Sequence, residues 1–267
     1  MSAFEGEPTV DVKLDPPVSL LPDYSRQALA YDTTRAASPS VLTSLRDALA
    51  GAPGPRLADI GGGTGNYALA LREDGWEPLV LDRSPDMLER AHAKGLQTIE
   101  ADAQKLPLPD HSVDGAMLLS MLHHVENPAL ALAEARRILR PGGRLALQVF
   151  TREDIEDLWV LELFPSSRSW MRATHPPLAD LLAHLPGARH LPIAYGDLHD
   201  ASLAALSAHP HKLLQPRWRE QTSYFERMAR DHPQELDSGL RRLRAQLDEG
   251  TAPSRPGKAS MLAWIKA

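Results

Sequence analysis

The sequence predicts an α/β fold: a doubly wound, mostly parallel sheet of seven strands with a helical insertion near the carboxyl terminus. Three observations support it. Short apolar runs alternate with amphipathic helical segments over residues 38–150, a glycine-rich turn follows the first apolar run, and the pattern after residue 151 becomes mostly helical. The 267 residues are 43% hydrophobic and 24% charged, fractions typical of globular chains, which excludes disordered and fibrous classes.

The elements can be placed in order along the chain. Residues 1–37 are predicted to form a loose arm or lid, because Pro, Glu, Asp and Gly are mixed there without an apolar period. The core domain is expected over 38–150, beginning with a helix whose N-cap is Ser38 and whose first residue is Pro39. The five strands expected in this domain are 56–60, 78–82, 97–101, 113–119 and 144–150, with helices between them.

Beyond this domain the pattern changes. Residues 151–258 are expected to be a helical, acceptor-recognising region with one strand at 191–195, and 259–267 the last strand of the core sheet. Two amphipathic helices are predicted between these strands. Their apolar faces are Trp218, Thr222, Phe225 and Ala229 for the first, and Leu236, Leu240, Leu243 and Leu247 for the second.

Composition also limits the compartment and the partners. The chain has no cysteine, which excludes disulfides, thiolate zinc sites and a catalytic thiol. Its amino terminus lacks signal-peptide features, and its longest apolar run, Ala116 to Leu122, is far shorter than the ~20 residues of a membrane helix. A cytoplasmic chain without membrane contact or a metal site is predicted. The net charge of -6 disfavours nucleic acid as a partner.

Chemistry is concentrated at the ends of the first three predicted strands. The run Asp59-Ile-Gly-Gly-Gly-Thr-Gly65 follows the first strand, where glycines allow a sharp turn and a close approach to a ligand. Asp82 ends the second strand about 20 residues later, the spacing at which a carboxylate meets two ribose hydroxyls. Asp102, after the third strand, is placed to accept a hydrogen bond from the amine of a base. Together they predict a nucleotide-type site.

The glycines at 61, 63 and 65 depart from the G-x-G-x-x-G spacing of dinucleotide-binding folds, which makes a dehydrogenase the weaker interpretation. The sequence instead resembles the class I S-adenosylmethionine-dependent methyltransferases, in particular the methyltransferase type 11 group that includes ubiquinone/menaquinone-biosynthesis-type enzymes. The resemblance covers about residues 24–150. It is carried by DIGGGTG (59–65), VLDRSPDMLERA (80–91), ADAQKLPLPDHSVD (101–114), LSMLHHV (119–125) and ARRILRPGGRL (135–145).

The resemblance implies S-adenosylmethionine as cofactor and S-adenosylhomocysteine as product. It implies that the three glycines pass beneath the methionine part of the cofactor and that Asp59 supports their loop. Asp82 would bind the ribose hydroxyls, while Asp102 and the backbone N–H of Ala103 would hold the adenine. The remaining residues expected to bind the cofactor are Gly61, Gly63, Gly65, Arg83 and Ser120, together with Tyr24, Tyr31 and Arg35 of the amino-terminal arm.

Two assignments stay open at this point. Met87 lies either against the adenine face or in the helix core. His123 and His124 follow the fourth strand, where the methyl group is expected to point; either can be a general base, with His123 favoured, or both can pack structurally. The distal histidines lack metal-ligand spacing and are interpreted as surface residues: His175, His184, His190, His199, His209, His211 and His232.

The sequence therefore favours an enzyme that transfers a methyl group from S-adenosylmethionine to an O, N or activated C atom of a small, partly apolar metabolite, acting as a monomer or homodimer. Two alternatives remain. One is an RNA methyltransferase, for which the mildly basic tail after Lys212 would form a clamp. The other is a cofactor-binding protein of this fold with a non-methylating role.

Overall fold

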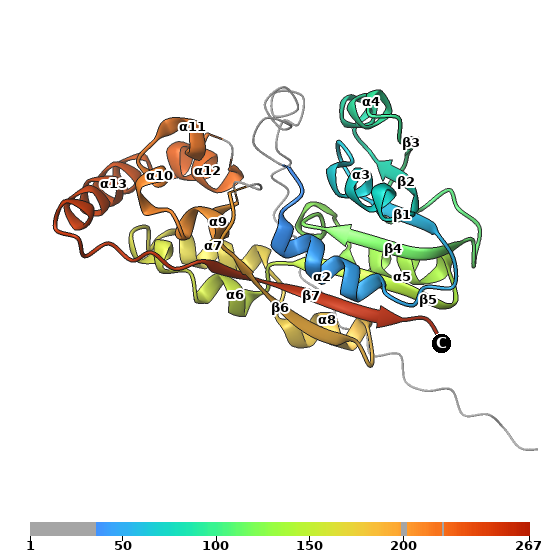
Figure 1. Ribbon diagram of the computed structural model, residues 1–267. Coiled ribbons are helices and arrows are strands. Elements are labelled where there is room, and N and C mark those ends of the chain that lie inside the picture. The colour runs from blue at the N-terminus through green and yellow to red at the C-terminus, as the bar shows by residue number, and fades with distance from the viewer. Residues whose placement is uncertain (1–35, 199–201, 221) are drawn as a thin grey trace, which may run out of the picture.

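The computed structural model describes residues 36–198, 202–220 and 222–267. Tyr24, Tyr31 and Arg35, and nearly all of the predicted arm, lie outside the described residues. Figure 1 shows a sheet that carries helices on both faces and a group of helices, α9 to α13, beside one end of it. The arrangement matches the doubly wound fold with a helical insertion that the sequence predicts.

Seven strands form one sheet in the order β3-β2-β1-β4-β5-β7-β6. They are β1 (Arg56–Ile60), β2 (Glu77–Asp82), β3 (Gln97–Glu100), β4 (Val113–Leu119), β5 (Leu139–Val149), β6 (Arg189–Tyr195) and β7 (Gly257–Ile265). β1 to β5 pair in parallel, while β7 runs antiparallel to both of its neighbours. The strand order reverses between β1 and β4, and in open α/β sheets ligands bind beyond the carboxyl ends of the strands at such a switch point.

Four helices cover the sheet within the core domain: α2 (Pro39–Leu49), α3 (Asn66–Glu73), α4 (Pro85–Ala93) and α5 (Pro128–Ile138). Each of α2, α4 and α5 begins with proline, which lacks the N–H that the first helical turn leaves unsatisfied. Ser38 and Asn127 cap α2 and α5 by accepting hydrogen bonds from backbone N–H groups. The helix ends are therefore set locally by the sequence.

Alternation along each strand divides the core into two layers. Leu57 of β1 packs with α2, α3 and α4 on one face, whereas Ala58 and Ile60 pack with α5 on the other. Both layers consist mainly of apolar side chains that are fully or nearly fully buried. Because helices cover both faces of the sheet, the polar residues at the strand ends lie at the edge of the sheet.

β5 begins earlier than the sequence predicts. The strand was expected to start at Arg144 after a Pro141-Gly142-Gly143 break, but it begins at Leu139, directly after α5. The pairing of β4 with β5 shifts register between Val113 and Gly115, so the proline and glycines form an irregular first part of the strand. The expectation of a separate loop there is wrong.

The region after β5 is mostly helical, as predicted. Its helices are α6 (Arg152–Glu156), the 3-10 turn η2 (Trp159–Glu162), α7 (Ser167–Thr174), α8 (Leu178–His184), α9 (Leu203–Ser207), α10 (Pro210–Leu213), α11 (Pro216–Arg219), α12 (Ser223–Asp231) and α13 (Pro233–Asp248). The ring of Phe164 meets those of Phe225 and Tyr224 edge-on, with centroids 5.8 and 6.3 Å apart. This aromatic cluster holds α12 against the segment before α7.

One of the two helices predicted here is wrong. Trp218, Thr222 and Phe225 were expected on one helix, but α11 ends at Arg219 and Thr222 caps α12. Its hydroxyl accepts a hydrogen bond from the N–H of Phe225, and this local bond competes with continuation of the helix. The second predicted helix is confirmed as α13.

Among residues 36–198, 202–220 and 222–267, no helix is long and apolar enough to cross a membrane. The same described residues contain no group of three or more His, Cys, Asp or Glu side chains placed to hold a metal ion.

Candidate functional site

The glycine turn joins β1 to α3 at the switch point of the sheet. Gly61, Gly63 and Gly65 all have positive φ angles, of 69°, 55° and 73°. The N–H of Gly61 donates to the carbonyl of Leu81 over 2.7 Å, which fixes the turn against β2. This is backbone that glycine adopts at little cost and that other residues adopt only with strain.

The glycines at 63 and 65 are required for different reasons. A Cβ added at Gly65 would lie 2.4 Å from Cδ1 of Leu96, so this position is needed for packing as well as for φ. Within the described part of the chain, a Cβ at Gly63 would meet nothing within 4 Å. Among these residues Gly63 therefore leaves room for a ligand above it.

Asp82, at the carboxyl end of β2, is bonded directly to the turn. One of its oxygens accepts a hydrogen bond from the N–H of Gly63 and the other from the N–H of Ser84, each over 2.9 Å. An ionised carboxylate has about four lone-pair positions, so both oxygens can accept further hydrogen bonds. Two features predicted from separate stretches of sequence thus form one unit.

Asp59 lies beneath the same turn and is only 2% exposed. A Cβ on Gly62 would lie 2.4 Å from its carboxyl group, so the side chain is packed directly against the glycine backbone. Burial, reinforced by the negative charge of Asp82, raises the pKa of Asp59 to about 8. At neutral pH the carboxyl group is therefore mostly protonated, in a position to support the turn without adding charge.

A pocket opens above the turn, between the ends of β1 and β4. Its lining residues are Ala36, Asp59, Gly61, Gly62, Gly63, Thr64, Asn66, Tyr67, Leu119 and Ser120. Ser120 has a φ of 51°, unusual for a residue other than glycine. Strained backbone of this kind clusters at functional sites, and here it sits at the wall of the pocket.

Ser120 is held by a residue that the sequence prediction missed. Its N–H donates to the carbonyl of Gln148 over 3.0 Å, and its hydroxyl donates to Oε1 of the same side chain over 2.6 Å. Gln148 is 1% exposed, and within the described part of the chain its Nε2 has no hydrogen-bond partner. A glutamine in the apolar run of β5 was the available signal.

The other predicted cofactor residues lie along the same edge of the sheet. Asp102 is exposed beyond β3, and Ala103 beside it is buried. Met87 on α4 is buried, at 3% exposed, while Arg83 after β2 is exposed. None of the four lines the pocket above the turn; in the chain they follow β2 and β3.

The two candidate bases lie in a short 3-10 turn, η1 (Leu122–His124), after β4. The ring centroids of His123 and His124 are 3.8 Å apart, and His123 stacks on His175 at 5.9 Å with 19° between the planes. The interpretation of His175 as a surface residue is wrong. The segment between α7 and α8 lies against the turn that follows β4, a contact that no spacing in the sequence indicates.

The environment of His175 defines its protonation. Its Nδ1 lies 2.8 Å from the carbonyl of Met171, so the neutral ring carries its proton there and leaves Nε2 unprotonated. Burial lowers the pKa of His175 to about 4, against the opposing effects of the Met171 carbonyl and of Asp154. A neutral imidazole thus stands behind His123.

Comparison with known proteins identifies the family of the chain. A family model described as a methyltransferase domain matches residues 58–147. A demethylmenaquinone methyltransferase of Tropheryma whipplei is 32% identical over 178 residues, which are 62% of this chain and 70% of that protein. An uncharacterised methyltransferase of Mycobacterium tuberculosis is 39% identical over 136 residues.

The M. tuberculosis match covers 50% of this chain and 54% of the relative, so the chain spans about half the length of that protein. Among solved structures, a methyltransferase attributed to an antibiotic biosynthesis pathway of Anabaena variabilis is 25% identical and superposes with a TM-score of 0.70. That superposition covers 86% of this chain and 98% of the other. The likeness therefore extends beyond the matched domain into the helical region.

Proposed function

The chain belongs to the class I S-adenosylmethionine-dependent methyltransferases, and we propose that it transfers a methyl group from S-adenosylmethionine to an O, N or activated C atom of a small, partly apolar metabolite. One observation carries the proposal: the hydrogen bond from the Gly63 N–H to Asp82, which joins the glycine turn and the ribose-type carboxylate at the switch point.

The residues present fit the cofactor. Asp82 keeps lone pairs for two ribose hydroxyls, and Gly63 leaves open the space that a Cβ would occupy. Gly61 and Gly65 hold the turn, supported from below by Asp59. Ser120 would border the methionine end from the β4 side, where it lines the pocket.

The remaining assignments belong to the same proposal. Asp102 and Ala103 would hold the adenine, with Met87 against its face and Arg83 at the rim. Tyr24, Tyr31 and Arg35 would close over the cofactor from the amino-terminal arm.

When bound, S-adenosylmethionine supplies a methyl group on a sulfonium centre that already contains its leaving group. The chain's residues then have to orient the acceptor and exclude water, because positioning supplies much of the rate of such a displacement. Where the acceptor must lose a proton, we assign its removal to His123, with His124 as the neighbouring candidate. His175 would keep the ring of His123 in place through their stacking contact.

Two observations support a partly apolar acceptor. The relative from Tropheryma whipplei is named for a quinone-type substrate, demethylmenaquinone. In this chain, Phe150, Trp170 and Tyr195 pack in or against the hydrophobic cluster that includes the helices after β5. An activated carbon on an aromatic ring is therefore the leading acceptor within the proposed range.

The test is formation of S-adenosylhomocysteine. The purified chain is incubated with S-adenosylmethionine and one of three probes, a reduced naphthoquinone, a catechol and a primary arylamine, and the product is quantified by mass spectrometry. Product formation with at least one probe, lost in Asp82→Ala, is expected. Cofactor binding without product from any probe would favour the non-methylating alternative, and salt-sensitive binding of tRNA would favour the RNA alternative.

A further inference from the structure

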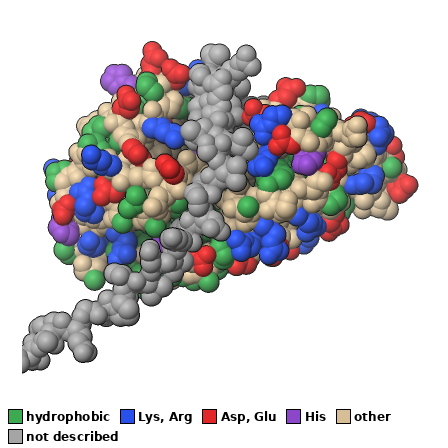
Figure 2. Space-filling model, turned by 180° about the vertical axis from the view of Figure 1, so that it is seen from behind, with side chains coloured by type: hydrophobic (Ala, Val, Ile, Leu, Met, Phe, Trp, Pro, Cys, Tyr) green, Lys and Arg blue, Asp and Glu red, His purple; other side chains and the backbone are tan. Residues whose placement is uncertain are grey.

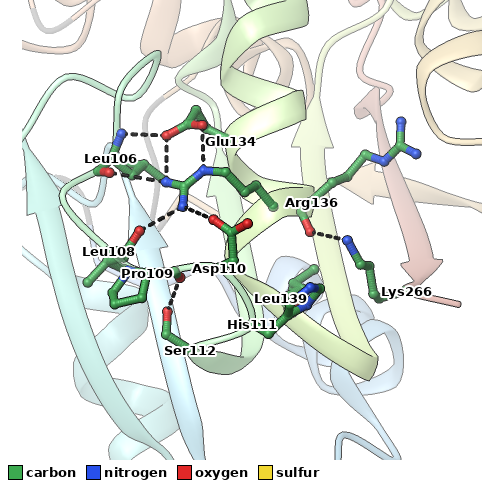
Figure 3. Close-up of polar contacts among 11 residues, drawn as sticks. Leu106, Leu108, Pro109, Asp110, His111, Ser112, Glu134, Arg136, Leu139 and Lys266 are labelled. Atoms are coloured by element: carbon green, nitrogen blue, oxygen red, sulfur yellow. Dashed lines mark hydrogen bonds and ion pairs between the residues drawn. The ribbon is translucent and has the colours of Figure 1, made fainter.

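The loop between β3 and β4 is held by one side chain of α5. Arg137 extends its guanidinium from α5 into this loop, whose residues Leu106, Leu108 and Asp110 are labelled in Figure 3. It donates to the carbonyls of Leu106 and Leu108 over 3.1 and 2.8 Å, and to the carboxylate of Asp110 over 2.7 Å. Arg137 thus joins three points of the loop to one helix.

Glu134 completes this arrangement one turn earlier on α5. Both of its oxygens accept from Arg137, over 2.7 and 2.8 Å, and one also accepts from the N–H of Leu106 over 2.7 Å. The hydrogen bonds from Arg137 hold the pKa of Glu134 and that of Asp110 below their usual values. Both carboxylates are therefore ionised at neutral pH. Arg137, Glu134 and Asp110 form a charge-assisted hydrogen-bond network rather than a single ion pair, and we call this network the Arg137 clamp.

The clamp holds the same loop that carries Asp102. Leu106, bonded through both its N–H and its carbonyl, is 5% exposed and packs in the core layer that contains α5. Between Leu106 and Asp102, the backbone and side-chain N–H groups of Gln104 donate to the Asp102 carboxylate over 2.9 and 3.2 Å. Oε1 of Gln104 accepts from the N–H of Asn127, at the start of α5, over 2.8 Å. Hydrogen bonds from both ends of α5 therefore help to hold Asp102 in position.

We propose that Arg137 is a positioning residue for the adenine end of the cofactor: by fixing the 101–112 loop against α5, it sets the Asp102 carboxylate where it selects the exocyclic amine of adenine. The inference rests on the proposed function, since it takes Asp102 as the acceptor of that amine. Arg137 acts through the loop and touches no ligand itself.

The experiment is calorimetric titration of the full chain with two probes. S-adenosylhomocysteine carries the adenine amine, and S-inosylhomocysteine carries an oxo group in its place. The wild type should prefer the first probe. Arg137→Gln should bind S-adenosylhomocysteine about tenfold more weakly, the effect of one lost hydrogen bond to a charged group, and should lose most of its preference. Arg137→Lys keeps the positive charge but not the several N–H donors of the guanidinium. Its affinity and its preference should lie between those of the wild type and Arg137→Gln.

A matched control is available at the next position. Arg136 donates to the carbonyl of His184 and lies over the ring of Trp264, away from the loop, so Arg136→Gln should keep both affinities. Gln104→Ala provides a second test outside α5, which stays informative if the Arg137 variants fold poorly. It should reduce the preference between the probes because the Asp102 carboxylate loses the side-chain amide donor of Gln104 and keeps only the backbone N–H.

The results separate this inference from the proposed function. Binding of S-adenosylhomocysteine by the wild type with no preference between probes, or an unchanged preference in Arg137→Gln and Gln104→Ala, would overturn the positioning role and leave the proposed function standing. Equal weakening of both probes in these variants would also overturn it, since that is the mark of general structural loss. A wild type that binds neither probe would overturn both.

Discussion

The two halves of the molecule are built by different means. In the half that carries the glycine turn, backbone conformation and a few short hydrogen bonds place the site, as between Gly63 and Asp82. In the helical half after β5, large side chains such as Phe164 and Phe225 fix the arrangement by packing. The difference implies that substitutions in the first half should remove ligand binding at small cost in stability, and those in the second half should do the reverse.

The largest effect is expected at the centre of the helical half. Phe164 is fully buried, with its ring against Gly239 of α13. Phe164→Ala should lower the free energy of unfolding by about 3 to 5 kcal/mol in a urea titration, because it leaves a large cavity. Its affinity for S-adenosylhomocysteine should stay unchanged below the transition. The control is Ile265→Ala at an exposed position, and loss of affinity in Phe164→Ala would break the division between the halves.

The glycine turn gives a comparison within the first half. Gly65→Ala should destabilise the chain by about 1 to 2 kcal/mol for its left-handed φ, and by about 1 kcal/mol more for contact with Leu96. Gly63→Ala should be destabilised only by its left-handed φ, but its Cβ would project into the open space beneath a ligand. We therefore expect Gly65→Ala to be less stable by thermal unfolding, and Gly63→Ala to be weaker in cofactor binding. The opposite order would contradict the roles assigned to the two glycines.

Asp59 should make stability depend on pH. Its folded pKa, about 8, is raised above the unfolded value near 3.8, so the native state holds an extra proton between these limits. This contribution is fully present below about pH 4 and is lost as pH rises toward 8, by at most about 1.4 kcal/mol per pH unit. Asp59→Asn should remove this slope, as measured by urea unfolding at pH 6, 7 and 8. Equal slopes in the two proteins would show that Asp59 is ionised when folded.

His175, in the second half, should act with the opposite sign. Its folded pKa, about 4, lies below the ordinary value of 6.5, so stability should fall as pH drops through that range. The slope should again be at most about 1.4 kcal/mol per pH unit, but over a narrower pH range than that of Asp59. His175→Gln should remove this slope between pH 6.5 and 4. An imidazole resonance of His175 that titrates near pH 6.5 by NMR would contradict the assignment.

Local signals in the sequence predict the first half well. The glycine turn, Asp82 and the strands that carry them depend on residues close together, and the cap and proline positions of α2, α4 and α5 are likewise local. The early start of β5 at Leu139 could not be predicted from the sequence, because it depends on how β5 pairs with β4.

The contacts that the sequence did not predict join distant residues. His175 reaches His123 across the end of the sheet, and Gln148 reaches Ser120 from the neighbouring strand. The Arg137 clamp fixes the 101–112 loop against α5. Such contacts depend on the packing of the whole fold, so the periodicity and spacing of residues in the sequence do not predict them. The break before α12 is different, since Thr222 was a recognisable cap that the longer apolar pattern hid.

The central claim is that the glycine turn and Asp82 form one S-adenosylmethionine site, and calorimetric titration of the full chain tests it most directly. The wild type should bind one equivalent of the cofactor. Asp82→Ala should weaken binding by about 1 to 3 kcal/mol, through the loss of a charge-assisted hydrogen-bond pair. Asp86→Ala, an exposed carboxylate on the adjacent helix, should bind normally. A wild type that gives no heat with the cofactor, or an Asp82→Ala variant that binds like the wild type, would contradict the claim.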